Sequence, residues 1–353
     1  MDDKISRLRG RIDEIDETLL ELLNERAGIA RKVGEEKKTG VIYRPEREAQ
    51  VHRRLHSKNL GPLSNEGVSH LFTEIISACR AQEERLSIAC LGPAGTFSEE
   101  ASFRQFGRHI DLVYCSSIDE VFRVVSSRKV SYGVVPLENS TEGAISQTLD
   151  LLSVSTLSIC GEVGLRVQHN LMAKEDKPQY GKIYSHAQSL GQCQKWLSKR
   201  QAQAELIPVS SNAEAARMVA KDADSAAIAG RHAAHHYELS IIEESIEDNP
   251  NNTTRFGVIS GEGVAASGLD KTSILLASKH EPGAIFELLE PLARNQISMT
   301  RLESRPSKQG LWEYMFFIDI EGHQDDAIIS RALDEISAKA GLFKILGSYP
   351  KSI

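Results

Sequence analysis

The sequence lacks any hydrophobic run long enough to span a membrane. No apolar stretch in its 353 residues approaches the roughly 18 residues that a transmembrane helix needs. The N-terminus also lacks the basic flank and apolar core of a signal peptide. Its five cysteines include no C-x-x-C pair, so we expect reduced thiols. These absences together predict a cytosolic protein.

Positive charge is in deficit as well. The chain carries 42 basic and 49 acidic residues, for a net charge of −7. General nucleic-acid binding is therefore not expected, because phosphate contacts need a basic surface. An anionic small-molecule substrate stays possible, since a pocket can be locally basic on an acidic protein. Low-complexity tracts and tandem repeats are absent too, and the length suggests two or three domains.

The strongest pattern that is present is a heptad repeat over residues 3–38, which predicts one long helix. Such a helix is about 50 Å long at 1.5 Å per residue, too long for a domain of about 85 residues to cover, so we expect a partner chain. Two more helices are predicted, one starting at Pro45 and one over about residues 64–84. The apolar positions of the repeat are Ile5, Leu8, Ile12, Ile15, Leu19, Leu22, Ile29 and Val33.

Arg26 interrupts this apolar seam. A buried guanidinium needs an anion, so the seam is predicted to open there into an anion site. Lys37 follows by 11 residues, close to three turns, and points the same way. Arg9 and Lys37 taken alone are typical of solvated coiled-coil charges.

From residue 86 to residue 260, β-rich runs alternate with helical stretches, which predicts an α/β region with a mainly parallel sheet. Two loops, at residues 92–98 and 136–143, join a strand to a helix at the carboxyl ends of strands, where α/β proteins bind ligands. Helix capping explains each loop equally well when it is taken alone. Two further polar clusters follow, at residues 185–193 and 252–256. After a small-residue linker at residues 261–268, the order βαββαβ predicts a ferredoxin-like domain.

The helical region resembles the all-helical chorismate mutases. The resemblance covers residues 1–84 and rests on Leu8-Arg9, Asn24-Glu25-Arg26, Lys37, Arg44-Pro45-Glu46-Arg47-Glu48 and Cys79-Arg80-Ala81-Gln82-Glu83. It implies a dimer in which Arg9 of one chain joins Arg26 of the other in holding the two carboxylates of chorismate. Lys37 would then face the ether oxygen, and Glu48 would position the ring hydroxyl. A Claisen rearrangement suits such a set, because it needs only a held conformer and a stabilised developing charge.

This region departs from its relatives at two places. Val51 and His52 replace an arginine and a glutamate of some members, and Glu83 stands where others carry glutamine. A glutamate can donate to the ether oxygen only when it is protonated. The mutase rate is therefore predicted to decline as pH rises.

The α/β region resembles prephenate dehydratase through four motifs in order: Gly92-Pro93-Ala94-Gly95-Thr96-Phe97-Ser98, Pro136-Leu137-Glu138-Asn139-Ser140, Ser185-His186-Ala187-Gln188 and Asn252-Thr253-Thr254-Arg255-Phe256. The resemblance implies two α/β lobes like type 2 periplasmic binding proteins, with the site between them. It implies Thr254 as the catalytic threonine, helping the ring hydroxyl leave. Glu138, Asn139 and Gln192 are expected to assist it, and whether Glu138 acts as an acid stays open. The expected substrate-binding residues are Thr96, Ser98, Ser140, Ser185, His186, Arg255 and Phe256.

The C-terminal region resembles the phenylalanine-binding ACT domain. Leu302-Glu303-Ser304-Arg305-Pro306 matches one family element, whereas Gly283-Ala284-Ile285-Phe286 departs from the usual Gly-Ala-Leu-Val. The resemblance implies that phenylalanine binds between paired ACT domains and inhibits the enzyme. The expected contacts are Gly283, Ala284, Ile285, Leu302, Glu303, Ser304 and Arg305.

The sequence therefore predicts a multidomain enzyme: an all-α mutase domain at residues 1–86, a two-lobed dehydratase domain at 87–264 and an α+β ACT domain at 271–353. It would convert chorismate to prephenate and then to phenylpyruvate as a homodimer or larger homo-oligomer, with no membrane or nucleic-acid partner. No cofactor or metal is expected, because His232, His235 and His236 are typical of a surface helix. Three alternatives stay open: a non-catalytic ligand-binding regulator, a dehydratase whose first 84 residues only dimerise, and a preference for arogenate.

Overall fold

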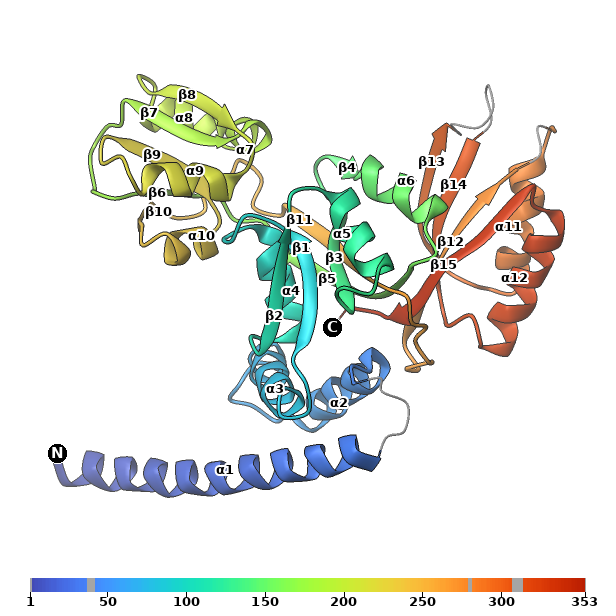
Figure 1. The fold of residues 1–353 in the computed structure, drawn as a ribbon, viewed down its shortest axis with the longest axis horizontal. Coiled ribbons are helices and arrows are strands. Elements are labelled where there is room, and N and C mark those ends of the chain that lie inside the picture. Colours follow the sequence, from blue (N-terminus) through green and yellow to red (C-terminus); the bar gives the residue numbers. More distant parts are fainter. Residues whose placement is uncertain (1, 37–41, 279–280, 307–313, 353) are drawn as a thin grey trace.

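The computed structural model describes residues 2–36, 42–278, 281–306 and 314–352. Its elements fall into the three successive parts that the sequence predicts, with a helical module below, a two-lobed region in the middle and a sheet with two helices at one side (Figure 1). Among the helices so described, none is both long and apolar enough to cross a membrane.

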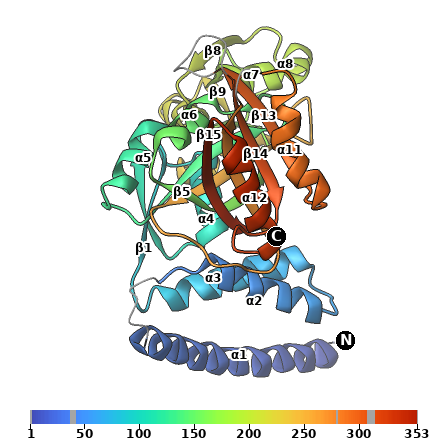
Figure 2. The ribbon, with the colours of Figure 1, turned by 90° about the vertical axis from the view of Figure 1, so that its right-hand side faces the viewer.

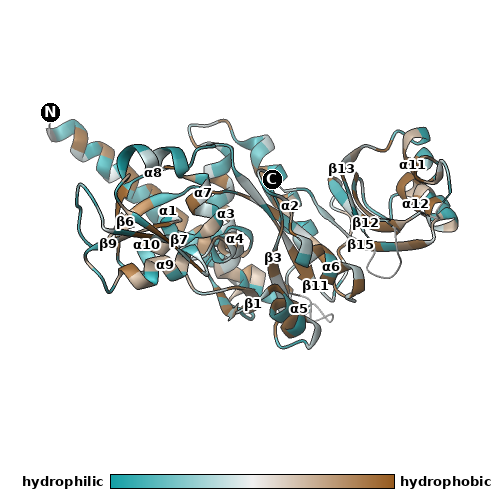
Figure 3. Cartoon of the chain, turned by 90° about the horizontal axis from the view of Figure 1, so that it is seen from above, coloured by the Kyte–Doolittle hydropathy of each residue, from teal (hydrophilic) through white to brown (hydrophobic). Residues whose placement is uncertain are grey.

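The helical module consists of α1 (Asp2–Glu36), α2 (Pro45–Lys58) and α3 (Asn65–Arg80). The prediction of one long first helix is confirmed, as is the start of the second at Pro45. Ser64 caps α3 by accepting a hydrogen bond from the Gly67 amide at 3.1 Å. In Figure 2, α1 lies below the α2–α3 pair, and the projecting end of α1 alternates between hydrophilic and hydrophobic residues in Figure 3. The apolar seam is largely uncovered, with exposures from 45% at Ile15 to 58% at Leu8.

The first lobe is built on a sheet of order β2-β1-β3-β11-β5, with β4 paired to β3. The prediction of a mainly parallel sheet is wrong here, because β11 returns from the second lobe and runs antiparallel to both neighbours. Only β1 pairs in parallel, with β2 and β3. The elements are β1 (Leu86–Leu91), α4 (Phe97–Phe106), β2 (Ile110–Cys115), α5 (Ile118–Ser126), β3 (Tyr132–Asn139), β4 (Gly143–Ala144), α6 (Ser146–Val154), β5 (Ser158–Arg166) and β11 (Thr253–Ser260).

The second lobe has a mixed sheet of order β10-β6-β9-β7-β8. Two chain segments join it to the first lobe, and they are tied together by the Val167 amide donating to the Asn252 carbonyl at 2.8 Å. The elements are β6 (Asn170–Ala173), β7 (Lys182–His186), α7 (Ala187–Gln192), α8 (Gln194–Arg200), β8 (Glu205–Val209), α9 (Asn212–Val219), β9 (Ser225–Ala229), α10 (Arg231–His236) and β10 (Ser240–Glu243).

The C-terminal part has the predicted βαββαβ order and an antiparallel sheet of order β13-β14-β12-β15. Its elements are β12 (Asp270–Ala277), α11 (Ala284–Arg294), β13 (Met299–Pro306), β14 (Tyr314–Glu321), α12 (Ala327–Lys339) and β15 (Leu342–Pro350).

The two faces of this C-terminal sheet are buried against different partners. Strand alternation turns Ile274 and Leu276 toward α11 and α12, whereas Leu275 packs into the core of the first lobe. The approach is close at Gly347, where an added Cβ would collide with the backbone of Ile159. The sheet is thus one wall of the first lobe as well as part of its own domain.

Candidate active site

A cavity of about 560 Å³ lies between the two lobes, and both lobes line it. The predicted site residues that line it are Thr96, Ser98, Asn139, His186, Gln192 and Thr254. Motifs that are far apart in the sequence therefore meet at one place. Gln188 and Asn252, which belong to the predicted motifs but were given no role, also face it, and so do His169 and Asn212, which the sequence did not single out.

Thr254 lies on β11 beside Asn139, its cross-strand partner on β3. The Asn139 Nδ2 donates to Thr254 Oγ1 at 2.8 Å and to Asn252 Oδ1 at 2.8 Å. These two bonds use both hydrogens of the amide. Because the Thr254 oxygen accepts from Asn139, its own hydrogen is available to a ligand in the cavity.

The orientation of the Asn139 amide is fixed from its other end. The Asn139 Oδ1 accepts from the backbone amides of Thr141 at 3.0 Å and Glu142 at 3.2 Å. Backbone N–H groups can only donate, so the amide cannot be reversed without losing both bonds. Asn139 is itself 7% exposed. The backbone amides of Thr141 and Glu142 therefore fix Nδ2 as the atom that faces Thr254.

A second amide extends this network to a histidine. The Gln192 Oε1 accepts from Asn252 Nδ2 at 3.1 Å and lies 2.9 Å from His169 Nε2. Since a carbonyl oxygen only accepts, His169 must carry its hydrogen on Nε2. Its Nδ1 is buried and has no hydrogen-bond partner among the described residues. Burial lowers the pKa of His169, although the Gln192 contact and the charge of Glu247 oppose this, so the neutral ring is favoured.

The glycine-containing loop at residues 92–98 acts as a helix cap. Thr96 is the N-cap of α4, accepting from the Glu99 amide at 3.3 Å, and its hydroxyl donates to the Leu91 carbonyl at 2.8 Å. The Gly95 amide donates to the buried Glu99 carboxylate at 2.5 Å. The capping interpretation of this loop is thus confirmed. Thr96 and Ser98 still face the cavity, so their contact with substrate stays a prediction.

Five predicted site residues do not line this cavity: Glu138, Ser140, Ser185, Arg255 and Phe256. Phe256 is 2% exposed within the core of the first lobe. Ser185 is buried and donates to Asn212 Oδ1 at 2.9 Å, so it holds a residue that does face the cavity. Ser140 Oγ accepts from the Thr253 amide at 3.0 Å and anchors the start of β11. Glu138 and Arg255 point toward the C-terminal sheet instead.

The helical module brings together only part of the predicted mutase set. Glu48 lies 2.5 Å from the buried Arg80, and burial raises its pKa while Arg80 and Arg26 oppose that rise. The Glu83 carboxylate lies against α1 at Gly34, where an added Cβ would collide with it. Lys37 lies outside the described residues.

Arg9 stands apart from this group. It precedes Arg26 by 17 residues on the same helix, a rise of about 25 Å at 1.5 Å per residue. One chain therefore cannot bring Arg9 and Arg26 to the same small ligand.

The residues expected to bind phenylalanine lie on α11 and β13 of the C-terminal domain. Gly283 caps α11 with a left-handed φ of +82°, and Ala284 and Ile285 begin that helix. Leu302, Glu303 and Ser304 lie within β13. Arg305 reaches out of the domain, donating to the Ser146 carbonyl at 2.6 Å and pairing with Asp150 at 3.3 Å on α6.

Comparison with known proteins accounts for all three parts. Three family models match in order: chorismate mutase type II over residues 8–84, prephenate dehydratase over 88–263 and the ACT domain over 272–338. A prephenate dehydratase from Arthrobacter aurescens, solved in complex with L-Phe, is similar over 75% of this chain and 90% of that chain, with 30% identity and a TM-score of 0.69.

Whole-chain relatives carry all three parts in one polypeptide. A bifunctional chorismate mutase/prephenate dehydratase from Neisseria gonorrhoeae is 51% identical over 98% of this chain and 96% of its own length. One from Pseudomonas aeruginosa is 47% identical over 99% of both chains. The chain therefore belongs to the family of bifunctional chorismate mutase/prephenate dehydratases, with a C-terminal ACT domain.

Proposed function

We propose that this protein rearranges chorismate to prephenate in its helical module and converts prephenate to phenylpyruvate in the cavity between its two lobes. Phenylalanine, bound at the ACT domain, would inhibit the second step. The observation that carries the dehydratase assignment is the hydrogen bond from Asn139 to Thr254, because it leaves the threonine hydrogen free for the substrate.

In the dehydratase step, the bond from the ring to its carboxylate breaks and releases carbon dioxide. The electron pair moves into the ring, the carbon–oxygen bond breaks, and the departing hydroxide takes a proton from solvent to become water. Thr254 donates its hydrogen to that oxygen as negative charge develops on it. A threonine hydroxyl is a weak acid, so its contribution is a hydrogen bond more than a full proton transfer.

The amide network supports this role by holding Thr254 in one orientation before substrate arrives. His169, Gln192 and Asn252 continue the network away from Thr254, so no member is free to turn when charge develops. Donors fixed in this way need no reorganisation during the reaction, which is the main source of electrostatic stabilisation in enzymes. Gln192 and Asn139 are therefore assigned to positioning Thr254.

For the mutase step, we propose a cytoplasmic homodimer in which two α1 helices pair along their apolar seams. The uncovered seam supports this pairing. The partner's Arg9 would then join Arg26 on the substrate carboxylates, since 17 residues of helix separate the two within one chain. Lys37 and Glu83 would face the ether oxygen, and Glu48 the ring hydroxyl.

The test is incubation of the purified protein with chorismate, followed by chromatographic detection of prephenate and phenylpyruvate. Thr254→Val should abolish phenylpyruvate formation while chorismate is still consumed, because the two steps use different sites. Thr253→Val is the matched control, since Thr253 is exposed and its hydroxyl makes one long bond, to the Asn251 carbonyl at 3.4 Å, within the described part of the chain. Equal phenylpyruvate formation by both variants would refute the role of Thr254.

The Arg26→Ala variant tests the alternative function in which the helical module only dimerises the protein. We expect this variant to lose chorismate consumption and to retain conversion of added prephenate. Unchanged chorismate consumption would remove the mutase site from this module.

A further inference from the structure

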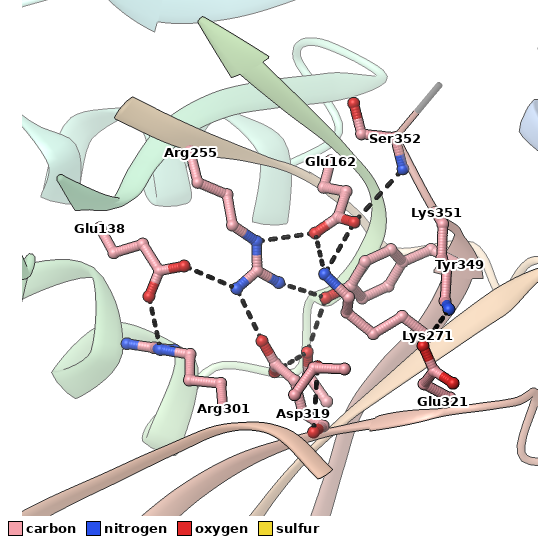
Figure 4. A network of polar contacts seen from close by, with 12 residues as sticks. Glu138, Glu162, Arg255, Lys271, Arg301, Asp319, Glu321, Tyr349, Lys351 and Ser352 are labelled. Carbon is pink, nitrogen blue, oxygen red and sulfur yellow. Dashed lines mark hydrogen bonds and ion pairs between the residues drawn. The ribbon is translucent and has the colours of Figure 1, made fainter. Parts of the chain in front are cut away.

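Two residues next to the catalytic pair point away from the cavity. On β3 and β11, Asn139 pairs with Thr254, and the adjacent pair is Glu138 with Arg255. Successive side chains of a strand point to opposite faces. Figure 4 shows Glu138 and Arg255 within a polar network shared with the C-terminal sheet. The catalytic pair and this network thus occupy adjacent positions on each of the two paired strands.

Arg255 is fully engaged in that network. Its Nε lies 2.7 Å from Glu162 Oε2 on β5, and its Nη1 lies 2.6 Å from Asp319 Oδ2 on β14. Its Nη2 donates to the Tyr349 hydroxyl on β15 at 2.8 Å. Burial lowers the pKa of Arg255, but these neighbours outweigh the burial and raise it overall. A guanidinium held in this way is not available to a substrate carboxylate.

Glu138 joins Arg255 to the strand expected to bind phenylalanine. One carboxylate oxygen lies 3.2 Å from Arg255 Nη1, and the other lies 2.6 Å from Arg301 Nε on β13. Arg301 is 12% exposed, and it directly precedes the segment at residues 302–305. Half-buried ion pairs of this kind keep a specific geometry better than exposed ones, because leaving one partner unpaired is costly.

We infer that Glu138 and Arg255 are positioning residues that couple the ACT domain to the Thr254–Asn139 pair, with Arg301 as the ACT end of the connection. A displacement of β13 moves Arg301 and, through their ion pair, Glu138. Because Glu138 directly precedes Asn139 on β3, this displacement changes the position of Asn139. This assigns neither residue to substrate contact, in contrast to the expectation from the sequence motif. The inference rests on the proposed function, both for Thr254 as the donor and for phenylalanine binding near residues 302–305.

The principal test compares Arg301→Gln with Arg294→Gln in the full-length protein. Both variants remove one positive charge from the ACT domain, but the partners of Arg294 among the described residues are Glu290 and Glu335, on its own domain's helices. We expect Arg301→Gln to reduce inhibition of prephenate turnover by phenylalanine by about tenfold or more, within the usual range of allosteric coupling. Phenylalanine binding, measured by calorimetry, should persist in both variants. Phenylalanine should inhibit Arg294→Gln as it inhibits the unmodified protein.

A double-mutant cycle with Glu138→Gln tests whether the two residues act together. If Arg301 acts through Glu138, adding Arg301→Gln to Glu138→Gln changes the phenylalanine response little further. Arg301→Lys should restore part of the response, since it keeps the charge.

Identical phenylalanine inhibition in Arg301→Gln and Arg294→Gln would overturn the inference while leaving the proposed function intact. So would an Arg255→Lys variant that only raises KM for prephenate and keeps the full phenylalanine response, because that result indicates direct substrate contact. An unmodified protein that forms no phenylpyruvate would overturn the proposed function and this inference together.

Discussion

Asn139→Asp would reverse the hydrogen bond to Thr254 and remove the one to Asn252 Oδ1, while changing almost nothing in shape. The substitution replaces the Nδ2 donor, 2.8 Å from Thr254 Oγ1, with an oxygen that can only accept. The Thr254 hydrogen then turns toward the new carboxylate and away from the substrate. The bonds from the Thr141 and Glu142 amides to the other oxygen are kept, so the loop after β3 stays in place.

The expected loss follows from the single donor that is misdirected. Removing one preorganised donor from a developing oxyanion typically lowers kcat by about 10²–10³, or roughly 2.7–4 kcal/mol. We expect a loss of this size in phenylpyruvate formation, with a smaller change in KM. Initial rates with added prephenate, corrected for uncatalysed loss, measure both constants.

A pH profile makes this prediction specific. The new carboxyl titrates with a pKa set by two opposed causes: burial beside the oxygens of Thr254 and Asn252 raises it, and the Thr141 and Glu142 amides lower it. As pH falls through that pKa, the protonated form can donate again, and the kcat of the variant should rise relative to the unmodified protein. Asn251→Asp, an exposed change of equal charge in the preceding loop, should show neither effect. Full activity of Asn139→Asp at neutral pH would refute the proposed orientation of Thr254.

Three further outcomes are expected. Glu83→Gln should flatten a mutase rate that otherwise declines as pH rises, and an unchanged profile in steady-state assays would exclude Glu83 as the donor. Ile12→Asp, on the uncovered seam of α1, should dissociate the dimer in analytical ultracentrifugation and abolish mutase activity; a mutase-active monomer would exclude the shared site. Because burial lowers the pKa of His169, its contribution to stability is complete above about pH 6.5 and is lost as pH falls through the lowered value. His169→Gln should therefore weaken the fall in Tm between about pH 7 and 5, and an unaltered fall in calorimetric scans would contradict this.

Local signals made much of the fold predictable. The alternation of β-rich and helical runs that starts at residue 86 is confirmed by β1 at residues 86–91 and α4 at residues 97–106, and Thr96 and Gly107 mark the two ends of α4. The strand at residues 158–166 gave no such signal. It carries a charged residue, Glu162, which is buried because it pairs with Arg255 and Lys271 from distant parts of the chain. A tertiary partner thus permits a residue that would otherwise argue against a buried strand.

The site was predictable as a set of motifs, but the direction of each side chain was not. Polar runs such as residues 252–256 look like turns, and the structure makes most of this one the start of β11. Neighbours in one motif then face opposite sides of the sheet, with Thr254 in the cavity and Arg255 at the ACT domain. His169 was missed because a single histidine between apolar segments carries no pattern of its own. Its role depends on Gln192, which lies 23 residues away in the sequence.

The shared core beneath β12 and β15 affects how the protein can be divided. Leu275, Phe317 and Leu346 of the ACT sheet belong to the same buried cluster as Leu137 and Leu152 of the first lobe. A fragment ending in the linker at residues 261–268 would expose that apolar surface to water and invite aggregation. The first lobe and the ACT sheet should therefore melt as one cooperative block, and a protease cut within the linker should leave the two halves associated.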